Sequence, residues 1–136
     1  MKKIMGIDIG EKRIGIAVSD SLGYTAQGVE TYTRTGEEDA AYIAAKMKEL
    51  GASKVVVGLP LNMNGSEGPA AQRVREFADK LQALGVEVDF QDERLTTVSA
   101  ERMLIEADVS RRKRRQVVDK LAAVYILRAY LDRHPV

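Results

Sequence analysis

Residues 3–10, with the sequence KIMGIDIG, place a single carboxylate, Asp8, inside an apolar run. Ile4, Ile7 and Ile9 give this run apolar side chains on both faces, which predicts a strand in the centre of a sheet. Burying an ionised Asp without a partner costs several kcal/mol or forces the group to take up a proton. Asp8 therefore requires a cation, a network of donors or an opening to water, and the rest of the chain must supply one of these.

The length and composition of the chain predict one soluble domain that spans residues 1–136. A chain of this size can bury roughly two-thirds of its unfolded surface around a single core. The absence of Cys excludes disulfides and thiolate metal sites, and no apolar run approaches the roughly 20 residues of a membrane span. The first residues also lack the pattern of a signal peptide, so we expect a cytoplasmic protein that does not contact a membrane.

The net charge of +1 conceals an uneven distribution of basic residues. Residues 111–115, RRKRR, hold five of the 21 Lys and Arg, which leaves 16 basic residues against 20 acidic residues in the rest of the chain. A run of charge is often only a solvated surface. A single basic focus on a slightly acidic body nevertheless favours a local anionic partner.

Strand and helix patterns follow one another in a definite order. The expected strands are residues 3–10, 13–20, 25–33, 54–59 and 86–90. The expected helices are residues 36–50, 69–84, 95–107 and 116–132, with the basic run as a connection between the last two. Tight turns join the first three strands, which should therefore form an antiparallel meander.

This order of elements predicts an α/β fold with a five-stranded mixed sheet. Right-handed crossovers after the meander put the first strand in the centre, with the fourth and fifth strands beside it. The expected strand order is 3-2-1-4-5 with helices on both faces, which is an RNase H-like arrangement. Such sheets place their sites where the carboxyl ends of the parallel strands open.

Three carboxylates are expected at this edge of the sheet. Asp8 lies near the end of the first strand, Glu93 in QDERLTT follows the fifth, and Asp119 shares the apolar face of the last helix with Ala123 and Ile126. Each also has an ordinary explanation when taken alone. Asp119 is favourable in the first turn of a helix because of the helix dipole, and Glu93 could pair with a nearby Arg, either Arg94 or Arg13.

The three acids together point to a divalent metal site. Carboxylates brought together without a metal repel one another, and oxygen ligands with no Cys and a single His favour Mg²⁺ or Mn²⁺ over zinc. Two such ions on shared carboxylates can activate a water and stabilise the leaving oxygen of a phosphodiester. We therefore predict that Asp8, Glu93 and Asp119 are both metal ligands and catalytic residues.

This hypothesis requires Glu93 to reach Asp8 across the distance between the first and fifth strands. These strands should lie two places apart, roughly 10 Å at about 4.8 Å per strand, so Glu93 must lean inward to share a metal with Asp8. Asp92 is expected to point the other way, and Asp20, at the end of the second strand, is a candidate accessory acid.

Basic and polar residues near the same edge are candidate contacts to nucleic acid. They would bind backbone phosphates in a salt-dependent and largely sequence-blind way, and amides in the loop of residues 60–68 could also hold a phosphate. Two Phe and no Trp argue against extensive base stacking. The predicted contacts are Lys12, Arg13, Asn62, Asn64, Arg94, Arg111, Arg112, Lys113, Arg114 and Arg115.

Four segments of the chain resemble the YqgF/RuvX family, in the same order as in that family. They are MGIDIGEKRIGIAVSD, VVGLPLNMNGSEGPAAQRVREFA, DERLTT and VDKLAAVYILRAYL, which cover nearly the whole chain. The resemblance implies an RNase H-like fold related to Holliday-junction resolvases, and a nuclease that matures the 5′ end of pre-16S rRNA. By similarity the acidic residues of the family fall on Asp8, Glu93 and Asp119.

The expected function is therefore a metal-dependent endonuclease that acts on structured RNA, with branched DNA as the alternative substrate. Ribosomal precursor particles are candidate partners, and the protein is expected to be a monomer or a homodimer. Two other classes remain open. A strand with Asp-x-Gly also resembles the phosphate-binding strand of sugar kinases, actins and chaperone ATPases, although those enzymes need two such domains. A nucleic-acid-binding module without catalysis would use the same basic residues.

Overall fold

The computed structural model describes residues 3–93 and 111–134, and side chains in the second range from residue 117 onward. Its elements are β1 (Lys3–Ile9), β2 (Arg13–Ser19), β3 (Ala26–Thr33), α1 (Asp39–Leu50), β4 (Ala52–Leu59), α2 (Pro69–Ala83), β5 (Val88–Asp92) and α4 (Arg111–Arg133). The sheet order is β3-β2-β1-β4-β5. β1 is antiparallel to β2 and parallel to β4, and β5 is parallel to β4. The predicted RNase H-like sheet is confirmed.

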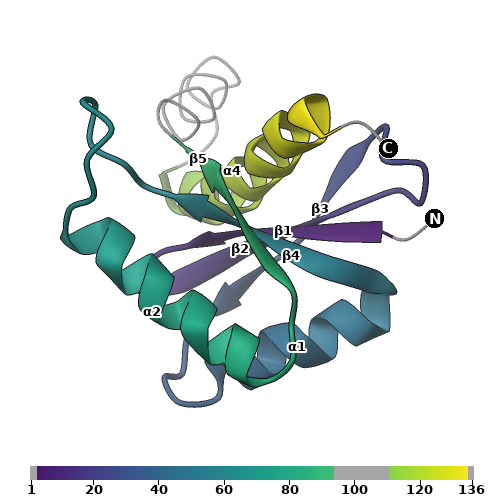
Figure 1. Cartoon of the computed structure of the whole chain (residues 1–136), viewed down its shortest axis with the longest axis horizontal. Helices are drawn as coiled ribbons and strands as arrows, with labels where there is room; N and C mark the ends of the chain where they lie inside the picture. The colour runs from purple at the N-terminus through teal and green to yellow at the C-terminus, as the bar shows by residue number, and fades with distance from the viewer. Residues whose placement is uncertain (1–2, 94–110, 135–136) are drawn as a thin grey trace.

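Helices cover both faces of the sheet (Figure 1). α1 and α2 pack on one face over the larger core, in which Met5 and Ile7 of β1 meet Ile43 and Phe77 of these helices. α4 crosses the other face and contributes Ala123, Ile126 and Leu127, all fully buried, to a second apolar layer. Successive residues of a strand face opposite sides of the sheet, so Gly6 and Asp8 of β1 lie on the face that α4 covers.

Glycines allow α4 to lie unusually close to the strands beneath it. A Cβ on Gly15 of β2 would be 1.8 Å from the backbone oxygen of Asp119, and a Cβ on Gly6 of β1 would be 2.8 Å from Cβ of Leu127. Real Cβ atoms do not approach other atoms this closely, and a glycine inside a strand often marks a close approach of another element. The position of Asp119 is thus set by contact between the helix backbone and β2.

Several boundaries differ from the sequence-based expectation, and two of these differences concern the elements that carry the predicted acids. β5 starts at Val88 rather than at residue 86, because Val86 packs into the core before the strand pairing begins. α4 begins at Arg111, so the expectation that residues 111–115 form a connection outside the helix is wrong. Lys and Arg are good helix formers, and the basic run contains no Gly or Pro to stop a helix.

The helix expected at residues 95–107 lies outside the described residues. Within the described part of the chain, none of the helices has the length and apolar composition needed to cross a membrane.

Candidate active site

The residues next to Asp8 on both neighbouring strands are glycines, so neither strand places a side chain beside the Asp8 carboxylate. Its Cα partner on β2 is Gly15. On β4, Val57 pairs with Ile7, so the next position along, Gly58, adjoins Asp8. The half-buried carboxylate of Asp8 therefore lies in a recess on the face beneath α4, between two glycines.

Glu93 reaches Asp8 from two strands away. Asp92, the last residue of β5, pairs with Leu59, and the N–H of Glu93 donates to the oxygen of Leu59 at 3.2 Å. The side chain of Glu93 then passes over Gly58, where a Cβ would be 2.7 Å from Oε2 of Glu93. The carboxyl groups of Asp8 and Glu93 are hydrogen-bonded to each other. The structure thus brings these two predicted residues together across a strand.

Burial and mutual repulsion change the protonation of this carboxyl pair. Burial, the charge of Asp8 and the hydrogen bond to Asp8 raise the pKa of Glu93 to about 9. Burial also raises the pKa of Asp8, as does the charge of Asp119, whereas the hydrogen bond from Glu93 lowers it. Glu93 therefore carries a proton at neutral pH and donates it to Asp8, as expected for two close carboxylates. Oε2 of Glu93 is buried and finds no donor among the described residues.

Asp119 has a different partner. Nε of Arg13, the first residue of β2, donates to Oδ2 of Asp119 at 2.6 Å. The charge of Asp119 still acts on the pKa of Asp8, so its carboxylate lies within electrostatic range of the pair. In the described residues, no three acidic or His side chains are arranged to hold a metal ion together. Two of the predicted acids are thus in contact, and the third is neutralised by a guanidinium nearby.

A divalent metal fits the donors that these residues provide. The buried and unpartnered Oε2 of Glu93 requires a proton or a cation, and a hard cation would replace the proton that Glu93 shares with Asp8. Carboxylate oxygens are the ligands that Mg²⁺ and Mn²⁺ prefer.

Comparison with models of protein families shows the family to which the chain belongs. Residues 2–133 match the model described as "RuvX: Holliday junction resolvase". The chain belongs to the RuvX family. Curated relatives are provisionally named pre-16S rRNA nucleases. The relative from Syntrophomonas wolfei is 55% identical over 96% of this chain and 94% of its own length, and that from Moorella thermoacetica is 56% identical over 96% and 95%.

Solved structures agree with the fold of this RuvX family member. The T. thermophilus RuvC in complex with a Holliday junction substrate matches with a TM-score of 0.56 and 16% identity, over 98% of this chain and 96% of that chain. A second structure of Thermus thermophilus RuvC matches with a TM-score of 0.50 and 15% identity, over 96% and 95%. At these identities the likeness concerns the fold alone.

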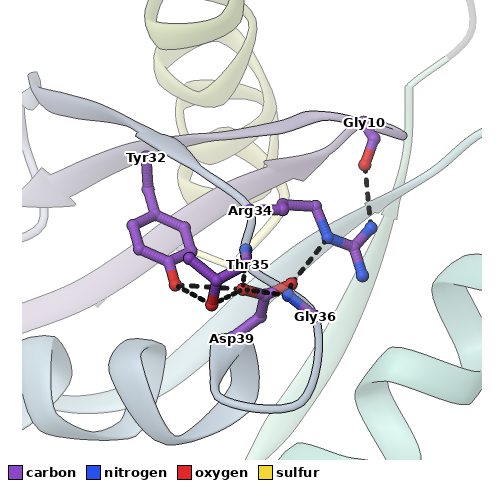
Figure 2. A network of polar contacts seen from close by, with 6 residues as sticks. All are labelled: Gly10, Tyr32, Arg34, Thr35, Gly36 and Asp39. Carbon is purple, nitrogen blue, oxygen red and sulfur yellow. Dashed lines mark hydrogen bonds and ion pairs between the residues drawn. The ribbon is translucent and has the colours of Figure 1, made fainter.

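The turn after Asp8 is held by a polar network around the buried carboxylate of Asp39 (Figure 2). Nε of Arg34 donates to Oδ2 of Asp39 at 2.9 Å, and its Nη1 donates to the oxygen of Gly10 at 2.9 Å. Burial alone would raise the pKa of Asp39, but hydrogen bonds from Thr35, Arg34, Tyr32 and Gly36 lower it to about 2. The network thereby fixes the turn of residues 10–12, which includes the exposed Lys12.

A cavity of about 210 Å³ opens beside Glu93. Its lining includes Gly10 and Pro60 from the ends of the central strands, and two basic side chains, Arg34 and Arg73. Nη2 of Arg73 lies 3.5 Å from Oε1 of Glu11. The cavity links the carboxyl edge of the sheet with the start of α2.

The loop of residues 60–68 is stabilised by its own polar side chains. Nδ2 of Asn62 donates to Oγ of Ser66 at 2.9 Å, and Oδ1 of Asn64 accepts from both the N–H and the hydroxyl of Ser66. Gly65 has a φ of 87°, a left-handed conformation that suits glycine. Asn62 and Asn64 thus have structural partners, and their exposed positions remain compatible with a phosphate contact.

Other predicted residues fall in different places. Arg94 lies outside the described residues, and the backbone of residues 111–115 forms the first turns of α4, before Asp119. Asp20 is wrong as an accessory acid, because β2 is antiparallel to β1 and carries it to the opposite edge of the sheet. There its Oδ1 accepts from the N–H of Tyr24 at 2.8 Å. Asp92 pairs with Leu59 of the larger core and so lies on the face opposite Asp8, as expected.

Sequence reasoning missed the part played by Gly15 and Gly58. Both lie inside apolar strand patterns, RIGIAVS and KVVVGL, where a glycine is unfavourable unless another group approaches closely. A glycine inside each apolar strand is therefore the feature of the sequence that indicates a close approach at these positions. One glycine makes room for the backbone at Asp119 and the other for the side chain of Glu93.

Proposed function

We propose that the protein is a metal-dependent endonuclease that hydrolyses phosphodiester bonds of structured nucleic acid, with the 5′ end of pre-16S rRNA as its substrate. The single observation that carries this proposal is the contact between Asp8 and Glu93, with the buried Oε2 of Glu93 lacking a donor among the described residues. The family match and the names of the curated relatives support it. The reaction would take place in the cytoplasm, on ribosomal precursor particles, by a monomer or a homodimer.

Asp8, Glu93 and Asp119 would hold Mg²⁺ or Mn²⁺. When bound, the metal supplies Lewis-acid stabilisation of the charge that develops on the phosphodiester and eases deprotonation of the attacking water. Glu93 must release its proton to become a ligand, and Asp8 must exchange its hydrogen bond to Glu93 for the cation. Because metal binding releases protons, it should be stronger at higher pH.

The remaining residues of the site would position the nucleic acid. Lys12 is exposed on the turn after Asp8, and the basic residues 111–115 precede Asp119 in the first turns of α4. Lys and Arg in such places bind phosphates without reading base sequence. The Arg34 network would keep the turn that carries Lys12 in place beside the cavity at Glu93.

Branched DNA is the second candidate substrate, and a specific finding favours it. The family model carries the description of a Holliday junction resolvase, and the fold matches a RuvC whose structure contains a Holliday junction. RNA and DNA phosphodiesters would place the same demands on the three acids, so the acids do not discriminate between these substrates.

A parallel cleavage assay tests both candidates. Labelled precursor rRNA and a four-way DNA junction are each incubated with the protein and Mg²⁺ or Mn²⁺. The Asp8→Asn variant should lose cleavage, whereas Asp132→Asn, an exposed Asp farther along α4, is the matched control and should keep it. Cleavage of the RNA alone supports the maturation role, and cleavage of the junction alone assigns the DNA substrate. Binding of either substrate without cleavage by the unmodified protein contradicts the endonuclease and favours a binding module.

A further inference from the structure

Arg13 and Asp119 form an ion pair at the edge of the proposed metal site. The Nε···Oδ2 distance is 2.6 Å, and the side chains are 32% and 20% exposed. Arg13 lies on the same face of β2 as Gly15, because the two residues are two positions apart in one strand. The guanidinium therefore lies on the α4 face of the sheet, which is also the face of Asp8.

This guanidinium and a metal ion would compete for the same carboxylate. A cation bound by Asp119 together with Asp8 would stand close to the positive charge of Arg13, and like charges at such distances repel. Among the described side chains no three acidic or His groups form a metal cluster, and Asp119 is paired with Arg13 instead. Without a metal, Asp8 and Glu93 are stabilised by a shared proton and Asp119 by Arg13.

We propose that Arg13 is a displaceable counter-ion of Asp119: metal binding releases its guanidinium, which then binds a phosphate of the nucleic acid. This inference rests on the proposed metal site. It makes Arg13 a positioning residue that couples the arrival of the metal to the binding of substrate, beyond a fixed phosphate contact.

The contacts of Arg13 suit such a movement. Within the described residues its guanidinium makes one hydrogen bond, through Nε, which leaves Nη1 and Nη2 for another acceptor. Arg34 provides a contrast on the same sheet. It is held at two points, by the fully buried Asp39 and by the oxygen of Gly10, and so is fixed in place.

Mn²⁺ titration by calorimetry tests the competition without any measurement of catalysis. Arg13→Gln should bind Mn²⁺ about two- to fivefold more tightly than the unmodified protein, the range expected when a partly exposed ion pair no longer opposes binding. Lys12→Gln is the matched control, because it removes a positive charge from the adjacent position in the chain and leaves the Arg13–Asp119 ion pair in place. Arg13→Lys keeps the charge but lacks the planar fork, and it should give an intermediate affinity. If Arg13→Gln does not fold, the Mn²⁺ affinity of Arg13→Lys tests whether Arg13 opposes metal binding.

Binding of a nucleic acid, measured with and without Ca²⁺ as a metal that permits binding, tests the release of the guanidinium. Arg13→Gln should weaken binding only when the metal is present, whereas Lys12→Gln should weaken it equally in both conditions. An Arg13→Gln variant with unchanged Mn²⁺ affinity, or with the same loss of nucleic-acid binding in both conditions, overturns this inference alone. If neither the unmodified protein nor Asp8→Asn binds Mn²⁺, the proposed metal site itself is wrong.

Discussion

Oε2 of Glu93 lies 2.7 Å from the point that a Cβ on Gly58 would occupy. The Glu93 side chain thus uses the space of a missing side chain on β4 to reach Asp8 on β1. Gly58→Ala would force the carboxylate of Glu93 and the end of Ile126 to move, because Cδ1 of Ile126 would be only 2.4 Å from the new methyl group. The contact between the two acids therefore depends on the absence of one methyl group.

Gly58→Ala should reduce cleavage by about 100-fold, since a displacement of about 1 Å at a catalytic group can have this effect. It should also lower the free energy of unfolding by about 1–3 kcal/mol, as overpacking does. Gly28→Ala is the matched control on β3, where the three atoms nearest to the new methyl group all belong to the side chain of Lys120 and none to Glu93. Urea denaturation and a cleavage assay check both variants. If Gly58→Ala and Gly28→Ala lose cleavage activity to the same extent, the space above Gly58 is not what positions Glu93.

The arrangement of the site could be predicted only in part from the sequence. Strand order follows from the alternation of apolar strands and helices, and it puts the carboxyl ends of β1 and β5 at one edge. This is why Asp8 and Glu93 could be assigned to the same edge. The pattern could not show that Glu93 spans the gap, because that depends on the space above Gly58.

The pairing of Arg13 with Asp119 was also beyond the sequence pattern. It depends on how closely α4 approaches β2, which the backbone contact at Gly15 sets. Periodicity assigned Asp119 to the buried face of the helix, and that face does meet the sheet. The start of α4 differs from the sequence-based expectation because the five basic residues belong to the helix and do not form a connection before it.

Stability of the metal-free protein should fall as pH rises from about 4.5 to about 9. The pKa of Glu93 is raised from its ordinary 4.5 to about 9, so in this window the folded state binds a proton that the unfolded state has lost. The free energy of unfolding therefore falls as pH rises, by less than about 1.4 kcal/mol per pH unit for this one group. Glu93→Gln removes the titration and should flatten this dependence. Urea midpoints between pH 5 and pH 9 in a chelator, about one pH unit apart, measure the slope; the same slope in both proteins would contradict the assignment.

Asp8→Asn should leave the metal-free protein as stable as the unmodified protein, or more stable. The substitution removes a charge that raises the pKa of Glu93, and an amide can still hydrogen-bond to the Glu93 carboxyl group. With metal present, the unmodified protein should instead be more stable than Asp8→Asn. At about 100 times its dissociation constant it should stabilise the unmodified protein by about 2.7 kcal/mol and Asp8→Asn by much less. Thermal denaturation with a chelator and with Mn²⁺ measures both effects. A large loss of stability in the chelator would mean that Asp8 is satisfied by structural donors instead.

Asp39→Asn should destabilise the protein at neutral pH by about 2 kcal/mol, and the difference from the unmodified protein should shrink in acid. The pKa of Asp39 is lowered from 3.8 to about 2, so its contribution is present above pH 3.8 and is lost as pH falls through about 2. The change also weakens the anchor of Arg34, which donates to Gly10 just after Asp8 (Figure 2). Glu37→Gln, an exposed neighbour in the same loop, is the control. Urea midpoints measured from pH 7 down to pH 2 check this prediction, and a difference that stays constant over that range would show that the carboxylate charge is not the source of the stability.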